Sequence, residues 1–310
     1  MTDINVTCIG GGHGLGNLLE VINDFNSVNL SAIVSTTDNG GSTGRLRESC
    51  DTISWGDIRY CLSKLSKALT NKQPSTKALL FEYRFNNVGD LSGHSLGNLI
   101  FCAVDSLCIR PTETVQVMRE YLGITANILP MSDAVTHLVS HCAEHSYIGE
   151  IEVDEHANQG IKKLVLIPKV KLSKEVLDTL KNTDILFLGP GSFYTSTLPS
   201  LLIDAVIDVI NQNTKLKIYF ITNVEDEFNN QIISDNNSKH SQHDEIYYQL
   251  EFIKNLGLTK TVHSLIPRHC VSASIELCKP YTIANLPGDS GGRHKHPFYR
   301  DQLLELIQRA

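Results

Sequence analysis

The chain has 310 residues, of which 41% are hydrophobic and 20% charged, a composition typical of a globular protein that is long enough for one large α/β domain. Its formal net charge is −7, which argues against general duplex binding through a basic face, so no nucleic-acid partner is expected, although a local basic pocket for one anionic ligand remains compatible with it. No apolar run approaches the roughly 20 residues of a spanning helix, so no membrane partner is expected either.

The N-terminus and the cysteines indicate a cytoplasmic protein. Residues 1–5 are polar and lead directly into an apolar run, without the basic start and apolar core of a secretory signal. The eight cysteines form no CxxC pair, and most of them lie in apolar surroundings. We therefore expect reduced, buried thiols and a cytoplasmic location.

A glycine-rich turn near the N-terminus comes first. The apolar residues 6–9 predict a short buried strand, and the spacing of apolar residues over 15–25 predicts a helix. Between them, segment 10–14 holds four glycines, which allow the backbone to turn sharply. The free N–H groups and partial positive charge at the start of such a helix suit a phosphate. A tight turn without a ligand is the alternative.

Two further loops of similar composition follow predicted strands. The second strand, residues 30–35, forms a βαβ unit with the first, which predicts a parallel sheet. The loop at 36–45 and the loop at 189–197 are both rich in glycine and hydroxyl side chains. Because the carboxyl ends of parallel strands share one edge, we expect these loops and the loop at 10–16 to form one site for a diphosphate.

The rest of the chain predicts further elements of a single domain, residues 1–310. Residues 126–167 predict a small β-rich insertion, with strands at 126–129, 134–139 and 148–153. Residues 225–245 are polar and predict a mobile loop. The other predicted helices lie at about 57–66, 75–85, 95–107, 111–122, 173–181, 200–209 and 246–256 and from 298, and the other strands at 184–188, 216–222 and 262–266.

The glycine pattern disfavours two common classes of nucleotide-binding protein. The dinucleotide motif GxGxxG would need glycine at position 15, which is Leu15. The motif GxxxxGK[ST] is absent. An NAD-dependent oxidoreductase and a P-loop phosphatase are therefore disfavoured, and the sequence predicts a nucleotide site of another kind.

Five motifs, in order along nearly the whole chain, resemble the CofD-like family. They are Gly10–Gly14, Thr37–Arg47, Gly56–Arg59, His94–Leu99 and Gly189–Ser196. That family holds 2-phospho-L-lactate transferase of deazaflavin cofactor synthesis and the YvcK-type gluconeogenesis factors, and the variants TTDNGG, WGD and GGGHG look closest to its YbhK-type branch. The resemblance implies a three-layer α/β/α fold with a mainly parallel Rossmann-like sheet and a nucleotide diphosphate at the carboxyl edge of that sheet.

The two branches of the family imply different functions. The gluconeogenesis-factor branch implies a UDP-sugar ligand and a regulatory role in cell shape and wall synthesis on gluconeogenic carbon sources. The transferase branch implies a guanosine diphosphate donor, a deazaflavin acceptor and magnesium. Position 39 is Asn where many relatives have Asp, which removes one metal carboxylate and leaves Asp38, the first candidate, and Asp57 to contact a metal directly or through water. Whether the chain catalyses a reaction, and whether it forms a homodimer, stay open.

The candidate catalytic residues are Asp38, Asp57 and His94. His94 is a candidate base for an acceptor hydroxyl, the alternative being a histidine at a helix start bonded to backbone. The predicted nucleotide-binding residues are Gly11, Gly12, His13, Gly14, Asp38, Asn39, Gly40, Gly41, Ser42, Arg45, Asp57, His94, Asn98, Gly189, Gly191, Ser192, Thr195, Ser196 and Asn223.

Other histidines carry weaker signals. His137, His141 and His145 have the helical spacing of metal ligands, but residues 134–142 also alternate like a strand. No carboxylate or cysteine supports a metal there, so that site is disfavoured. The run 294–296, His-Lys-His, is expected to be a solvated turn.

Overall fold

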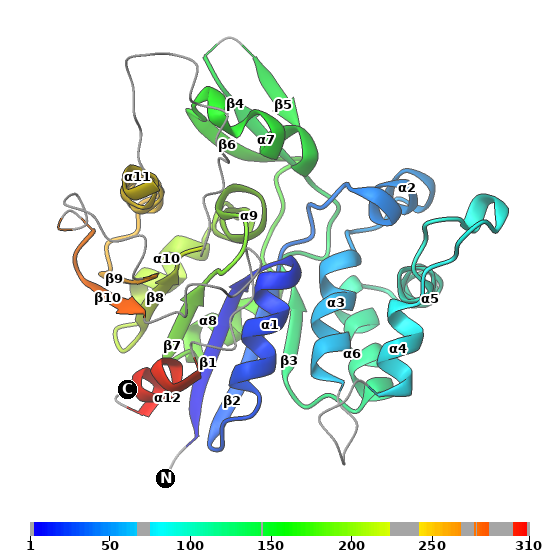
Figure 1. Cartoon of the computed structure of the whole chain (residues 1–310), viewed down its shortest axis with the longest axis horizontal. Helices are drawn as coiled ribbons and strands as arrows, with labels where there is room; N and C mark the ends of the chain where they lie inside the picture. The colour runs from blue at the N-terminus through cyan, green and yellow to red at the C-terminus, as the bar shows by residue number, and fades with distance from the viewer. Residues whose placement is uncertain are drawn as a thin grey trace.

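The computed structural model describes residues 3–66, 75–143, 145–223, 242–267, 276, 278–284 and 300–308. Its centre is a seven-stranded sheet in the order β10-β9-β8-β7-β1-β2-β3, and all neighbouring strands run parallel (Figure 1). The strands are β1 (Ile4–Gly10), β2 (Val28–Val34), β3 (Asn127–Pro130), β7 (Ile185–Leu188), β8 (Lys217–Ile221), β9 (Val262–Pro267) and β10 (Tyr281–Ala284).

Helices cover both faces of this sheet, because side chains alternate along buried parallel strands. On β1, Val6 and Cys8 pack into one apolar cluster and Ile9 packs into the other. The three-layer α/β/α fold is therefore confirmed. The first face carries α1 (Gly12–Ile22), α3 (Gly56–Leu65), α4 (Thr76–Glu82), α5 (Leu96–Asp105), α6 (Pro111–Leu122) and α12 (Arg300–Gln308); the second carries α8 (Lys174–Asn182), α9 (Leu198–Leu201), α10 (Val206–Gln212) and α11 (Gln242–Asn255).

The helix boundaries follow local sequence signals. Helix α8 begins after Ser173, whose hydroxyl accepts the Val176 N–H at 3.2 Å. Helix α6 has Pro111 at its first position and ends at Gly123, which has φ +69°. Most predicted helices lie within a few residues of the observed ones. The single helix predicted at 200–209 is, however, two helices, α9 and α10, and residues 41–45 of the predicted second loop begin a helix that was not predicted, α2 (Gly41–Cys50).

Strand order places the ends of β1, β2 and β7 together. Strand β1 lies between β2 and β7, with Cys8 opposite Ala32 on one side and Phe187 on the other. The chain moves from β1 to β2 and β3 and then returns to β7 on the opposite side, so the strand order reverses beside β1. Ligands of open α/β sheets bind outside the carboxyl ends of the strands at such a reversal.

The predicted β-rich insertion is partly wrong. Residues 127–130 form β3 of the main sheet, and the second sheet holds β4 (His137–His141), β5 (Ser146–Ile148) and β6 (Lys163–Ile167) in the order β5-β4-β6. The predicted strand at 148–153 is mostly helix α7 (Glu150–His156), followed by the short η2 (Ala157–Gln159). We call residues 137–167 the insertion; Figure 1 shows it above the carboxyl ends of β1 and β7.

The structure bears in part on the predicted mobile loop, the thiols and the membrane-spanning segments. Most of the predicted mobile loop 225–245 and the run 294–296 lie outside the described residues, and residues 242–245 already belong to α11. The seven described cysteines form no disulfide. Within the described residues, no single helix is long and apolar enough to cross a membrane; one bent pair, Phe193–Leu201 with Val206–Gln212, passes by length and composition alone.

Candidate functional site

The first loop, residues 10–16, approaches two other segments so closely that side chains are excluded. A Cβ on Gly11 would lie 2.3 Å from Asp57 Oδ2, and a Cβ on Gly14 would lie 2.3 Å from the carbonyl oxygen of Pro190. Gly12 has φ +56°, a conformation that favours glycine. The glycines of this loop therefore bring its backbone against α3 and against the turn after β7.

The second loop, residues 36–45, is held by a buried arginine. The Arg47 guanidinium donates to the carbonyl oxygens of Thr37 and Asp38, both at 3.0 Å, and to that of Thr136 at 2.6 Å. The Asp38 carboxylate accepts the Gly40 N–H at 2.7 Å. Arg47 thus joins the second loop to the segment that leads into the insertion.

The third loop, residues 189–197, closes against the other two. Asn223, two residues after β8, accepts the Gly191 N–H at 3.2 Å and donates to the Gly191 carbonyl oxygen at 2.9 Å. A Cβ on Gly191 would lie 3.5 Å from the Gly11 carbonyl oxygen, and the hydroxyl of Ser35, the residue directly before the second loop, lies 3.5 Å from the Thr195 carbonyl oxygen. The three predicted loops are therefore contiguous at one edge of the sheet.

Sequence reasoning missed two carboxylates that the insertion adds to this edge. Ser192 donates to Asp154 at 3.1 Å, and the buried Thr195 hydroxyl lies 3.3 Å from both Glu150 and Asp154. Both carboxylates lie on α7, Glu150 within the segment 148–153 that alternates like a strand and Asp154 directly after it. The signal that could have revealed them is the i, i+4 spacing of Glu150 and Asp154 directly after Gly149, which has φ +96°.

Asn39 also has a structural role at this point. Helix α7 has no side-chain cap from its own preceding residue, Gly149. The Asn39 side-chain oxygen Oδ1 instead accepts the Ile151 N–H at 3.2 Å, which satisfies one of the free amides at the start of α7. A Cβ on Gly149 would lie 2.2 Å from the Asn39 amide nitrogen, so the two segments are in close contact.

Four carboxylates converge beside the loops, and we call Asp38, Asp57, Glu150 and Asp154 the acidic centre. Burial, followed by the charge of Asp38, raises the pKa of Asp57 to about 7, although Asp57 accepts a hydrogen bond from the Gly12 N–H. Burial and the charges of the other three carboxylates raise the pKa of Glu150 well above its ordinary value. Both carboxyl groups therefore favour the protonated form more strongly than an exposed carboxyl group does.

Asp57→Asn is expected to flatten the pH dependence of stability between about pH 4 and pH 7 in the absence of divalent cations. The pKa of Asp57 is raised on folding, from 3.8 to about 7, so its contribution to the free energy of unfolding is complete at low pH and is lost as the pH rises through about 7. Urea unfolding at each pH, in chelator, measures this. Asp178→Asn, on α8, is the matched control, and a wild-type slope in the Asp57 variant would contradict the assigned burial.

The remaining predicted residues fall into two groups. Ser42, in the second loop, is joined by hydrogen bonds to His94 and Asn98, and all three residues are buried. His13 is exposed on α1 and packs on Tyr60, with ring centroids 4.3 Å apart. Arg45 is exposed and donates to the Ser92 carbonyl at 2.8 Å. Neither contact joins His13 or Arg45 to the acidic centre.

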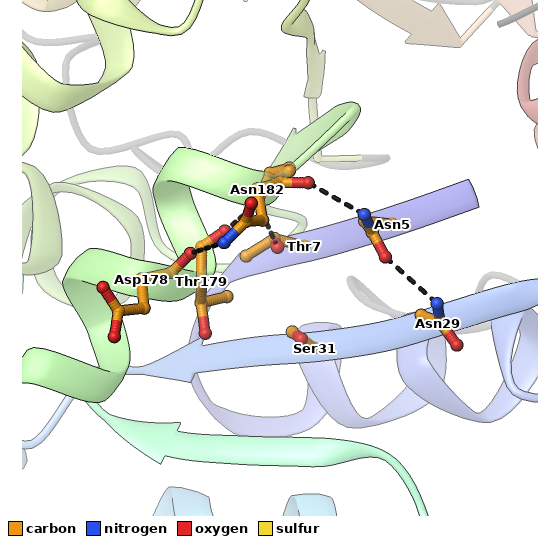
Figure 2. A pocket seen from close by; sticks show the side chains of 8 residues that line it. Asn5, Thr7, Asn29, Ser31, Asp178, Thr179 and Asn182 are labelled. Atoms are coloured by element: carbon orange, nitrogen blue, oxygen red, sulfur yellow. Dashed lines mark hydrogen bonds between the residues drawn. The ribbon is translucent and has the colours of Figure 1, made fainter. Parts of the chain in front are cut away.

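Two other polar features lie outside the three loops: a hollow beside α8, and a group of three side chains on α7. A hollow of about 280 Å³ opens between α8 and the first halves of β1 and β2, where Thr7 bonds Thr183 at 2.7 Å (Figure 2). It lies toward the amino ends of these strands, away from the loops. Its lining residues are Asn5, Thr7, Asn29, Ser31, Asp178, Thr179, Asn182 and Thr183.

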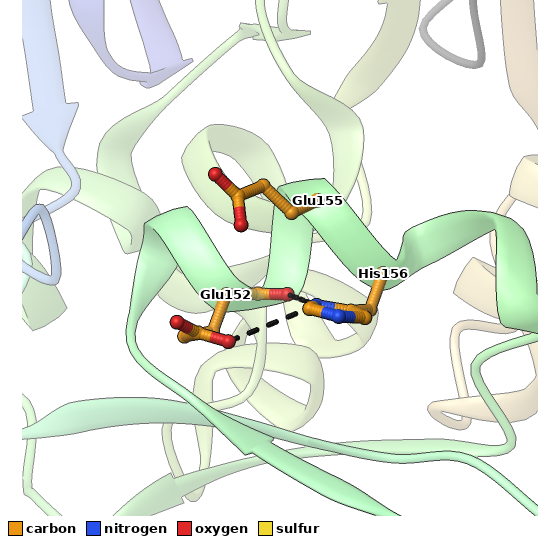
Figure 3. A group of neighbouring side chains, drawn as sticks. All are labelled: Glu152, Glu155 and His156. Atoms are coloured by element: carbon orange, nitrogen blue, oxygen red, sulfur yellow. Dashed lines mark hydrogen bonds and ion pairs between the residues drawn. The ribbon is translucent and has the colours of Figure 1, made fainter.

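The second group, Glu152, Glu155 and His156, lies on the surface of α7 (Figure 3). The two carboxylates are exposed, and the His156 ring is 2.9 Å from the Glu152 carbonyl oxygen and stacks on Tyr147. Such contacts are typical of a helix surface. His137 and His141 lie on strand β4 instead of a helix, and His141 contacts the Ser146 hydroxyl at 2.7 Å, so the helical metal spacing is not realised.

Comparison with known proteins identifies the family. The model of the family described as 2-phospho-L-lactate transferase CofD matches residues 6–259. The chain belongs to the CofD family. The match spans all three loops, α7 and Asn223, so the acidic centre lies within the family domain.

Relatives of this CofD-family chain carry the name gluconeogenesis factor. One from Vibrio cholerae is 41% identical over 224 residues, covering 72% of this chain and 73% of the relative. One from Halalkalibacterium halodurans is 37% identical over 217 residues, covering 69% and 65%. A crystal structure of a UPF0052-family protein from Bacillus halodurans superimposes with a TM-score of 0.74 at 30% identity, covering 89% of this chain and 84% of that one.

Proposed function

We propose that the chain is a cytoplasmic regulatory protein of the gluconeogenesis-factor type that binds a UDP-sugar and affects cell shape and wall synthesis during gluconeogenic growth. The observation that carries the proposal is the contact of three glycine-rich loops at the carboxyl edge of the sheet. Their backbone amides and the amino ends of α1, α2 (Gly41–Cys50) and α3 suit a pyrophosphate. The names of the relatives support the gluconeogenesis-factor assignment.

Magnesium fits this site for an electrostatic reason. A pyrophosphate beside the acidic centre would meet carboxylates whose pKa values are raised by burial and mutual repulsion. Carboxylate oxygens are the ligands that magnesium prefers, and the ion is commonly held by one or two of them together with substrate phosphates and water. Asp38 and Asp57 are the residues that would hold it, and the bound ion would supply positive charge between protein and phosphate.

The geometry of the carboxylates agrees with that mode of binding. Within the described residues, the group whose three ligand atoms lie within 4.8 Å of one another is Glu152, Glu155 and His156, on the surface of α7. The acidic centre does not offer three carboxylates so close together. It therefore suits an ion that retains water and shares the ligand phosphates, instead of a cation held by protein alone.

The alternative function is transfer of a phospholactyl or phosphoenolpyruvyl group from a guanosine diphosphate donor to a deazaflavin. The description of the matching family favours it. It needs an acceptor pocket and charge neutralisation at the phosphorus, and the acidic centre with magnesium would provide the second. It also needs a base for the acceptor hydroxyl, for which His94 is the candidate.

Calorimetric titration separates the two functions. UDP-N-acetylglucosamine is expected to bind in magnesium, to bind at least about tenfold more weakly in chelator, and not to be consumed. Guanosine diphosphate is expected to bind at least about tenfold more weakly than the uridine ligand. Preference for the guanine nucleotide, with turnover when deazaflavin is added, would favour the transferase and contradict the proposal.

Asp38→Ala tests the site in the same titration. The variant is expected to keep its thermal unfolding temperature within a few degrees and to lose at least about tenfold in affinity for the uridine ligand. Asp178→Ala, in the polar hollow beside α8, is the matched control and should bind as the wild type does. Equal affinities of the wild type and the Asp38 variant would place the ligand elsewhere.

A further inference from the structure

A chain of side-chain hydrogen bonds links four helices beside the second loop. Arg59 Nε donates to Asn98 Oδ1 at 2.8 Å, and Asn98 Nδ2 donates to Ser42 Oγ at 3.1 Å. Ser42 Oγ in turn lies 3.0 Å from His94 Nδ1. Arg59 also forms an ion pair with Glu82, at the end of α4. Arg59, Asn98, Ser42 and His94 are all less than one-tenth exposed, so water does not compete for these bonds.

The direction of every bond follows from the arginine. A guanidinium only donates, so Asn98 must present its oxygen to Arg59 and its NH₂ group to Ser42. Ser42 Oγ therefore accepts from Asn98. Among the described residues, His94 Nδ1 is the one acceptor within reach of the Ser42 hydroxyl hydrogen. The hydroxyl accordingly donates to Nδ1, and Nδ1 carries a lone pair.

The surroundings of the ring oppose a second proton on it. Burial and the positive charge of Arg45 lower the pKa of His94. Ser42 is the second residue of α2, and His94 lies two residues before the start of α5. The amino ends of both helices carry partial positive charge, which further disfavours an imidazolium. The ring is therefore neutral, with its single proton on Nε2.

We propose that the chain Glu82–Arg59–Asn98–Ser42 locks His94 in the Nε2–H tautomer, so that His94 donates a hydrogen bond to an anionic oxygen of the ligand and does not act as a general base. A general base needs a free lone pair to accept a proton. The lone pair on Nδ1 accepts the Ser42 hydroxyl hydrogen, and Nε2 carries the ring proton and has no free lone pair. Arg59, Asn98 and Ser42 are positioning residues in this account. The proposal has two halves. The ligand half, that His94 donates to the ligand, rests on the proposed function, whereas the tautomer half, that the ring proton is on Nε2, does not.

The tautomer is tested by NMR of ligand-free protein labelled with ¹⁵N-histidine, with His94→Gln to assign the signal. A proton on Nε2 and none on Nδ1 between pH 6 and pH 8 is expected for the wild type. Asn98→Asp is the matched reversal, because a carboxylate accepts from both Arg59 and Ser42. Ser42 then offers a lone pair to the ring, and the proton moves to Nδ1. A wild-type ring protonated on Nδ1, or a mixture of tautomers, would overturn the proposal.

Ser42→Ala keeps the tautomer test decisive where Asn98→Asp fails to fold. This variant removes the donor to Nδ1, so a mixture of the two tautomers is expected in place of one. If the Ser42 variant retains the pure Nε2–H form, the hydrogen-bond chain does not set the tautomer and the proposal fails.

The donor role is tested with UDP in magnesium as the probe. His94→Gln keeps an N–H donor and is expected to bind UDP within about threefold of the wild type, whereas His94→Leu is expected to lose about tenfold. Equal affinity of the leucine variant and the wild type would overturn the donor role. Failure of the wild type to bind UDP would overturn the ligand half together with the proposed function, while the spectra decide the tautomer separately.

Discussion

The Gly14→Ala variant is expected to lose UDP-sugar binding and about 2 kcal/mol of stability. Gly14 is helical and buried, so alanine would ordinarily favour the helix. Its Cβ would, however, lie 2.3 Å from the Pro190 carbonyl oxygen and 3.0 Å from the Gly191 amide nitrogen. Both are backbone atoms of the third loop, which must move away and open the contact between the first and third loops. Urea unfolding and calorimetric titration measure the two losses.

Gly10→Ala, in the same turn, is the control for this prediction. Its Cβ would lie 3.6 Å from the Leu15 Cβ, an ordinary van der Waals contact, and Gly10 has no positive φ. We expect this variant to keep most of its stability and affinity. If Gly14→Ala binds the nucleotide as tightly as Gly10→Ala does, contact between the first and third loops is not needed for the site.

The Arg47→Met variant is expected to lose about 3 kcal/mol of stability and to release the second loop. The methionine fills much of the same space but leaves the Thr37, Asp38 and Thr136 carbonyl oxygens without the donors they have in the wild type. Because Asp38 belongs to the acidic centre, affinity for the nucleotide should fall as well. Chemical unfolding gives the stability, and titration in magnesium gives the affinity.

Arg45→Met provides the matched comparison on the same helix. Arg45 is exposed and makes one hydrogen bond, to the Ser92 carbonyl, so its removal is expected to change stability by less than about 0.5 kcal/mol. An anion-binding role for Arg45 would still appear as weaker nucleotide affinity. Equal stability losses in the two variants would mean that the buried bonds of Arg47 contribute no more than one surface bond.

Much of the candidate site could be predicted from the sequence because its loops follow strands with clear patterns. Apolar residues 6–9 and 185–188 identify central parallel strands, and such strands carry their loops to one edge of the sheet. The glycines at 11 and 14 could be identified from the sequence as part of a sharp turn. What they approach, Asp57 and the Pro190 carbonyl, depends on tertiary packing that a single sequence does not encode locally.

The two carboxylates on α7 were missed because local periodicity favoured the wrong element. The sequence Ile-Gly-Glu-Ile-Glu-Val alternates in the way of a strand over 148–153. The structure forms a helix there because Gly149 takes φ +96° and Asn39, distant in sequence, caps the free amides of α7. The long-range bond between Arg59 and Asn98 likewise could not be read from spacing, since the two lie on different helices.

The central claim, that the three loops bind one pyrophosphate, is tested most directly by a crystal structure with UDP-N-acetylglucosamine and magnesium. The account predicts both phosphates among residues 11–14, 38–42 and 191–196, with magnesium between them and Asp38 or Asp57. A pyrophosphate bound in the polar hollow between α8 and the first halves of β1 and β2, or bound away from any of the three loops, would contradict it.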